Sequence, residues 1–177
     1  MDSETTSKIR QFKEIRSALL GLPLIRMYRA ADMRMLHFGK EREYRGGYVG
    51  EWALHILSSW RLLGPKGMIT GYSDLYRPIH EEDWSLDWDY ESGNLQDNNV
   101  LQFLHSAQLQ HVVEDLLIKD HGDLEMHFSG GYRIETFLNH SLEGAESSWL
   151  IFQPGDSESF FEMDQELYEQ GSFTAFN

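Results

Sequence analysis

Cysteine is absent from this chain of 177 residues. Without cysteine the protein has no disulfide, no thiolate nucleophile and no cysteine-ligated zinc or iron–sulfur site. Long hydrophobic runs are also missing, since no window approaches the roughly 18 apolar residues of a membrane span. The polar N-terminus is not followed by the apolar run of a signal peptide. We therefore expect a soluble, cytoplasmic protein that does not associate with membranes.

Basic residues are scarce in the second part of the chain. Residues 1–70 contain twelve Lys and Arg and seven acids, whereas residues 71–177 contain three basic residues and twenty-two acids, a balance of −19. This charge repels the phosphates of nucleic acids, so we predict no nucleic-acid binding, and it attracts basic proteins. A second interpretation is that the acids maintain solubility or neutralise the basic part inside the fold.

The usual catalytic and metal-binding motifs are missing as well. No serine lies in a GxSxG motif, and no HExxH motif occurs. Residues 64–70 superficially resemble a phosphate-binding loop, but the lysine precedes the glycine, so a turn is predicted there. Asp87, Asp89 and Glu91 alternate as in a calcium loop, yet the glycine comes one position late. We predict neither a metal nor a cofactor.

The composition that remains is typical of one globular domain. The mass is 20.7 kDa, with 41% hydrophobic and 13% aromatic residues. For this size, area scaling predicts that folding buries about 70% of the surface that the unfolded chain exposes. Because no repeat or linker is evident, we expect a single domain over residues 1–177, as a monomer or a homodimer.

Hydrophobic periodicity predicts an α+β fold that is mostly antiparallel sheet. Residues 8–20 have the spacing of an amphipathic helix, expected to cover a face of the sheet. From residue 24 the period changes to two, which predicts a hairpin with strands at 24–30 and 33–38. A long strand at 48–58 is apolar on both faces, as expected for the centre of a sheet.

The second part of the chain alternates between irregular and β-type sequence. A turn at 64–67 precedes a strand at 68–72, and residues 73–99 form a long irregular excursion before a short helix at 99–108. We expect a four-stranded meander, within one strongly curved sheet or one of two β-rich halves, over residues 112–119, 124–128, 132–138 and 149–152. The acidic tail, residues 156–169, is expected to be a docked helix or an extended edge.

The segment at residues 80–91, HEEDWSLDWDYE, is the best candidate for function. It combines six acids with two tryptophans and a tyrosine. Trp and Tyr concentrate binding energy at interfaces, and carboxylates raise the rate of association with a cationic surface. Alternatively, the tryptophans anchor a long loop to the core. The predicted partner-binding residues are Asp74, Glu81, Glu82, Asp83, Trp84, Asp87, Trp88, Asp89 and Tyr90.

A rival hypothesis is a small enzyme or ligand-binding domain. Its pocket would be lined by Trp52, His55 and Trp60, with His127 as a further candidate. Glu51 and His55 resemble a catalytic pair, but a strand separates them by about 13 Å, so they cannot touch directly. We lean towards a non-enzymatic protein.

Four stretches of the chain resemble an uncharacterised bacterial family of small α+β proteins: YVGEWALHILSSWRL, ITGYSDLY, GDLEMHFSGGYRIETF and SSWLIFQP. The resemblance covers most of residues 8–153. It implies the fold and a bacterial origin, and it assigns no site residue. Some small acidic bacterial domains of similar build are immunity proteins, which bind a toxin and block it. By this similarity of type, we predict an immunity-type inhibitor that engages a basic partner.

Overall fold

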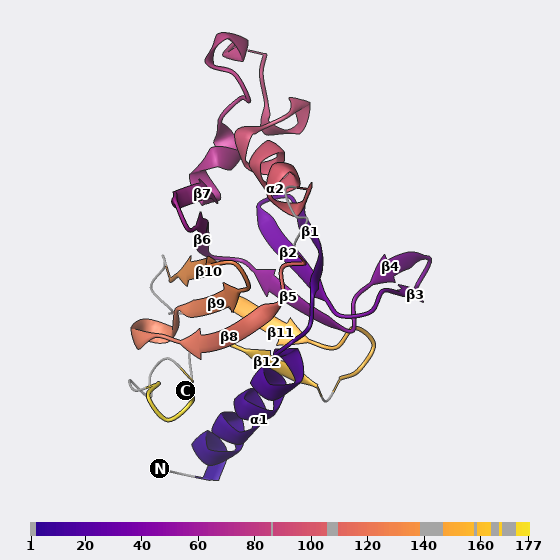
Figure 1. Cartoon of the computed structure of the whole chain (residues 1–177), viewed down its shortest axis with the longest axis vertical. Helices are drawn as coiled ribbons and strands as arrows, with labels where there is room; N and C mark the ends of the chain where they lie inside the picture. The colour runs from indigo at the N-terminus through magenta and orange to yellow at the C-terminus, as the bar shows by residue number, and fades with distance from the viewer. Residues whose placement is uncertain are drawn as a thin grey trace.

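The computed structural model describes residues 3–85, 87–105, 110–138, 147–157, 159–163, 167 and 173–177. These residues contain two α-helices and twelve strands, which confirms the predicted α+β fold (Figure 1). The helices are α1 (Ser3–Leu19) and α2 (Leu95–His105). The strands are β1 (Leu24–Ala30), β2 (Met33–Phe38), β3 (Arg42–Tyr44), β4 (Gly47–Val49), β5 (Trp52–Ile56), β6 (Ser59–Gly64), β7 (Gly67–Gly71), β8 (Val113–Ile118), β9 (Leu124–Phe128), β10 (Tyr132–Phe137), β11 (Trp149–Phe152) and β12 (Phe160–Glu162).

The strands form two antiparallel sheets of five strands and a separate hairpin, β3–β4. The first sheet has the order β1-β2-β5-β11-β12, and the second has the order β7-β6-β10-β9-β8. The hairpin β1–β2 turns at Ala31 and Asp32 as predicted. Strand β5 lies in the middle of the first sheet, between β2 and β11, which confirms its predicted central position.

The two sheets meet next to β1 and β8. Pro23 and Val112 form an isolated antiparallel bridge, and the Leu24 amide donates to the His111 carbonyl at 2.8 Å. Side chains from the facing sides share one buried cluster, in which Phe38 of β2 stacks on Phe128 of β9 with ring centroids 6.5 Å apart. The two β-rich halves therefore enclose a common core.

Helix α1 covers the end of this core formed by β8 and β12, as expected for an amphipathic helix. Phe12, Ile15 and Leu19 are buried, and the Phe12 ring lies 5.1 Å from the ring of Phe161 in β12. Arg16, on the edge of the helix, forms an ion pair with Asp115 of β8 at 2.6 Å. The helix begins five residues earlier than predicted, at Ser3.

The single long strand predicted at residues 48–58 is wrong. Residues up to Val49 form β4 of the small hairpin, β5 begins at Trp52, and β6 begins at Ser59. The first break includes Gly50, where an added Cβ atom would lie 2.5 Å from the Phe38 carbonyl oxygen. The backbone must approach β2 closely there, and only glycine permits it.

The predicted four-stranded meander is correct for three strands and wrong for the fourth. Strands β8, β9 and β10 pair in sequence. Strand β11 instead pairs with β5 and β12 in the first sheet. A period of two shows that a segment is extended but not which edge it joins, and residues 139–146 of the connection lie outside the described part of the chain.

The remaining elements follow the prediction in part. The turn at 64–67 connects β6 to β7 as expected. Helix α2 begins at Leu95 and not at residue 99, because the Asn94 side chain accepts a hydrogen bond from the Asp97 amide at 2.8 Å and so caps the helix earlier. The predicted helical residues 106–108 lie outside the described residues. Of the tail, residues 160–162 form edge strand β12, while residues 164–166 and 168–169 are not described.

Candidate functional site: an acidic arm

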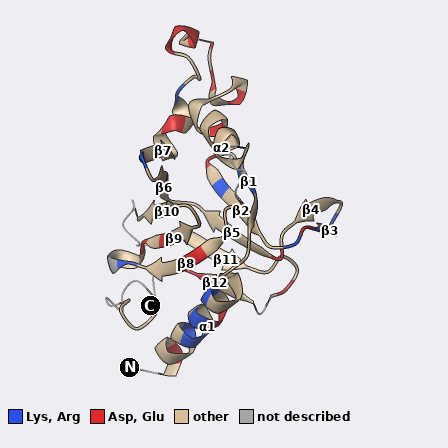
Figure 2. Cartoon of the chain, in the orientation of Figure 1, with Lys and Arg blue, Asp and Glu red and all other residues tan. Residues whose placement is uncertain are grey.

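The candidate site is residues 72–85 and 87–94, between β7 and α2, which we call the acidic arm. The arm contains three short 3-10 turns, η1 (Tyr72–Tyr76), η2 (Glu81–Asp83) and η3 (Tyr90–Ser92). It extends away from both sheets at the top of Figure 1. Figure 2 shows acidic residues at the tip of the arm and others nearer its base. The irregular excursion predicted from the sequence is thus a projecting element.

Two of the predicted binding acids stabilise turns of the arm. The Asp74 carboxylate accepts hydrogen bonds from the Thr70 hydroxyl at 2.8 Å and the Gly71 amide at 3.1 Å. The Asp89 carboxylate caps η3 by accepting from the amides of Glu91 and Ser92. Carboxylates engaged in this way are poorly placed to contact a partner. Their roles are structural ones that sequence spacing did not indicate.

The other four predicted acids, Glu81, Glu82, Asp83 and Asp87, are exposed. Glu81 has one partner, Arg77, at 3.4 Å. This is an exposed i,i+4 pair, which contributes only about 0.3–0.5 kcal/mol. The carboxylates at the far end of the arm therefore remain accessible to a cation from outside the chain.

The two tryptophans of the arm pack on each other. Their rings form an edge-to-face pair with centroids 5.1 Å apart. Trp88 is half-buried and donates its indole N–H to the Gly93 carbonyl at 3.2 Å, whereas Trp84 remains 53% exposed. The partners of Trp88, Trp84 and Gly93, both belong to the arm, so these contacts stabilise the arm itself, and anchoring to the core stays a prediction. Trp84 presents a large apolar surface to solvent among the free carboxylates.

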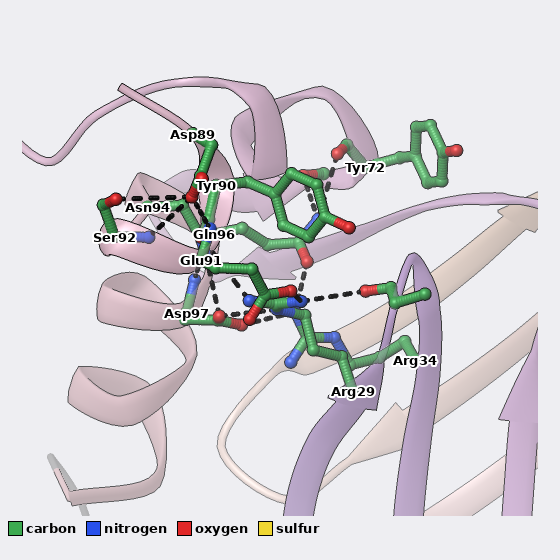
Figure 3. Close-up of polar contacts among 12 residues, drawn as sticks. Arg29, Arg34, Tyr72, Asp89, Tyr90, Glu91, Ser92, Asn94, Gln96 and Asp97 are labelled. Atoms are coloured by element: carbon green, nitrogen blue, oxygen red, sulfur yellow. Dashed lines mark hydrogen bonds and ion pairs between the residues drawn. The ribbon is translucent and has the colours of Figure 1, made fainter. Parts of the chain in front are cut away.

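The base of the arm is held to the body by a polar cluster (Figure 3). Arg29 of β1 forms ion pairs with Glu91 at 3.1 Å and with Asp97 of α2 at 2.7 Å. Arg34 of β2 forms an ion pair with Asp97 at 2.9 Å and a hydrogen bond to Gln96. Tyr90 packs its ring 5.1 Å from the Arg29 guanidinium. The arm is therefore fixed in orientation where it joins the sheets.

Burial and hydrogen bonding have opposite effects on the pKa of Asp97. Burial raises the pKa of the Asp97 carboxyl, but the hydrogen bonds from Arg29, Asn94 and Arg34 outweigh it, so the pKa lies below its ordinary value. Burial lowers the pKa of Arg34, which is only 1% exposed. The ion pairs keep both groups charged, and this cluster was not predicted from the sequence. An arginine among the apolar residues of a strand is the signal that could have indicated it.

Part of the charge asymmetry is neutralised inside the fold. Arginines of the first 70 residues pair with acids of the later part, as in Arg16–Asp115, Arg29–Asp97 and Arg61–Glu135. Among the described residues, the cation paired with the far end of the arm is Arg77, which belongs to the arm itself.

The structure does not bring the residues of the rival pocket together. Trp52 and His55 lie three positions apart on β5, so their side chains point to opposite faces of the sheet. The His55 ring packs edge-to-face on Phe152 at 4.8 Å, and burial lowers its pKa. Trp60 is buried beneath the Arg34 guanidinium, 5.3 Å away. His127 bonds to Glu125 on the side of β9 that faces away from the core.

Within the described ranges, no three His, Asp or Glu side chains are grouped so that they could hold a metal ion. No helix in that part of the chain is long and apolar enough to cross a membrane.

No protein-family model, curated protein or solved structure matches this chain. The resemblance to a bacterial family therefore stays a prediction.

Proposed function

We propose that this protein is a non-enzymatic binding protein whose acidic arm engages a basic protein partner, in the manner of an immunity-type inhibitor. The observation that carries the proposal is Trp84, which is 53% exposed on a projecting segment between accessible carboxylates. Large aromatic side chains anchor the centres of many protein interfaces, and polar residues form the rim around them.

The energetics favour a protein partner over a small ligand. The carboxylates of Glu81, Glu82, Asp83 and Asp87 attract a cationic surface over several ångströms and raise the association rate. Burying the exposed half of the Trp84 ring, roughly 100 Å², contributes about 2–3 kcal/mol at ~25 cal/mol per Å². The carboxylates thus raise the association rate, and burial of the Trp84 indole contributes the binding free energy.

The cluster at the base lowers the cost of binding. Because the Tyr90 ring packs 5.1 Å from the Arg29 guanidinium and the Asn94 side chain donates to Asp97 at 2.8 Å, the root of the arm is ordered before a partner arrives. Less conformational entropy is then lost on association.

The test compares two variants of equal charge. The arm variant replaces Glu81, Glu82, Asp83 and Asp87 by Lys, and the control replaces four exposed acids of the body by Lys: Glu4, Glu14, Glu43 and Glu114. Asp74 and Asp89 are left intact because they cap turns. Partners are trapped covalently through a photo-crosslinking amino acid in place of the exposed Ser85, which leaves Trp84 intact, and are identified by mass spectrometry.

We expect the wild-type chain and the control to crosslink one basic protein, and the arm variant to lose it. Trp84→Ala should weaken binding of that protein at least tenfold while its thermal midpoint stays within about 2 °C of the wild type. Equal loss in the arm variant and the control would show non-specific charge attraction and would refute the proposal. So would a crosslinked partner that is acidic.

A further inference from the structure

A hollow of about 460 Å³ lies at the base of the arm, between the hairpin β1–β2 and α2. One side is apolar and the other is charged. The apolar side is formed by Met27, Val100, Leu101 and Leu104, and the charged side by Arg29, Arg34, Glu91 and Asp97. A cavity of this size, with apolar walls and a few converging polar groups, has the usual character of a small-molecule site.

The two arginines of the wall are unusually buried. Arg34 is 1% exposed and the Arg29 side chain is 13% exposed. Nη2 of Arg34 bonds to Gln96 and Asp97, but its Nε has no hydrogen-bond partner among the described residues. Burial removes the guanidinium from water, and the unmade hydrogen bond leaves part of this free-energy cost uncompensated. Additional negative charge in the hollow is therefore electrostatically favourable.

The two carboxylates of the wall differ in how firmly they are held. Asp97 accepts hydrogen bonds from Arg29, Arg34 and Asn94. The Glu91 carboxylate bonds to Arg29 Nη1 at 3.1 Å, and its side chain is 65% exposed. Exposed ion pairs of this kind contribute less than about 1 kcal/mol to stability. Glu91 can therefore leave Arg29 at little cost, while Asp97 stays.

Once Glu91 turns outward, the wall holds two guanidinium groups against one carboxylate. We propose that the hollow binds a small organic monocarboxylate with an apolar body: its carboxylate replaces that of Glu91 at Arg29 Nη1, beside Arg34. The apolar body lies against Met27, Val100 and Leu101. The single negative charge of this ligand matches the positive charge that Glu91 leaves behind, and planar carboxylates suit the fork of a guanidinium.

The test uses 4-phenylbutyrate as the probe and its neutral amide, 4-phenylbutanamide, as the matched control ligand. Binding is followed by amide chemical shifts of β1 and α2 and by titration calorimetry. The wild-type chain should bind the acid saturably and at least tenfold more tightly than the amide. Glu91→Gln should bind the acid about two- to fivefold more tightly, because the competing carboxylate is gone.

A second variant places an extra charge in the wall without disturbing the core. Leu101 is 52% exposed, so Leu101→Glu should fold normally and lose binding of the acid at least tenfold. The proposal is overturned if the acid and the amide bind alike, if neither the wild type nor Glu91→Gln binds the acid, or if Glu91→Gln binds it no more tightly. These measurements do not involve the far end of the arm. Their outcome is therefore independent of whether the arm binds a protein partner.

Discussion

From the burial of His37 we predict that the folded protein loses stability in mild acid. His37 is 2% exposed in the middle of the first sheet. Its Nδ1 accepts a hydrogen bond from the Gly50 amide at 3.2 Å, and in the neutral ring Nε2 then carries the proton and donates to the Tyr28 hydroxyl at 3.0 Å. Burial, together with repulsion from the nearby His55 and Arg26, lowers the pKa of His37 to about 4. Protonation would thus place an unpaired charge inside the sheet.

The size of this stability loss follows from the difference between the pKa of His37 in the unfolded chain and in the folded chain. The unfolded chain titrates His37 near 6.5 and the folded chain near 4. Between these values the unfolded state binds more protons, so the free energy of unfolding falls as the pH falls through this window. At about 1.4 kcal/mol per pH unit, the contribution lost between pH 7.5 and pH 5 is about 2 kcal/mol, rising to about 3 kcal/mol below pH 4.

The assay isolates His37 from all other titrating groups. Urea unfolding is measured for the wild type and for His37→Gln at several pH values from 7.5 to 5. The stability advantage of the wild type over the variant should shrink by about 2 kcal/mol, because every other group titrates in both chains. The control is His80→Gln, which removes an exposed histidine and leaves His37 in place, so this variant should keep the loss of stability in acid.

The reasoning would be refuted by a difference between the wild type and His37→Gln that is constant with pH. It would equally be refuted by an NMR titration in which the His37 ring protonates near its ordinary pKa. Either result would mean that the ring accommodates a proton without cost, contrary to its burial.

Two further changes test the fold at the points that position the arm. Asp97→Asn leaves the buried Arg34 without its ion-pair partner and should lower the free energy of unfolding by about 2 kcal/mol, less than the ~3–5 kcal/mol of a fully buried pair because Asp97 is 38% exposed. Urea unfolding checks this, and a change below about 0.5 kcal/mol would contradict it. Gly50→Ala should cost about 1–3 kcal/mol in the same assay, since the new Cβ meets the Phe38 carbonyl at 2.5 Å; a variant as stable as the wild type would show that β2 and the Gly50 turn separate easily.

The local structure was largely predictable from short-range pattern. The hairpin β1–β2 and the meander β8–β9–β10 lie where alternation placed them, because each alternating segment buries one face on the common core. Two of the errors occur where a single contact determines where a strand or a helix begins. Gly50 interrupts a strand because β2 lies against its backbone, and Asn94 starts α2 early because its side chain caps the helix.

The candidate site was predictable only in outline. Segment 80–91 was selected for its Trp and acid content, and Trp84 is indeed exposed with accessible carboxylates beside it. Composition could not separate these carboxylates from Asp74 and Asp89, which cap turns of the arm. It also missed the cluster at the base, since Arg34 and Asp97 are 63 residues apart in sequence.

The sequence by itself determined the fold class, the position of most strands and the excess of acid after residue 70, because periodicity and charge are properties of short segments. Tertiary structure alone decided that β11 joins the first sheet, that Trp52 and His55 do not share a pocket, and that Arg29 and Arg34 meet Asp97 beside a hollow. These outcomes depend on which distant segments pack together. That choice rests on the summed burial and hydrogen bonding of the whole chain, which no local pattern records.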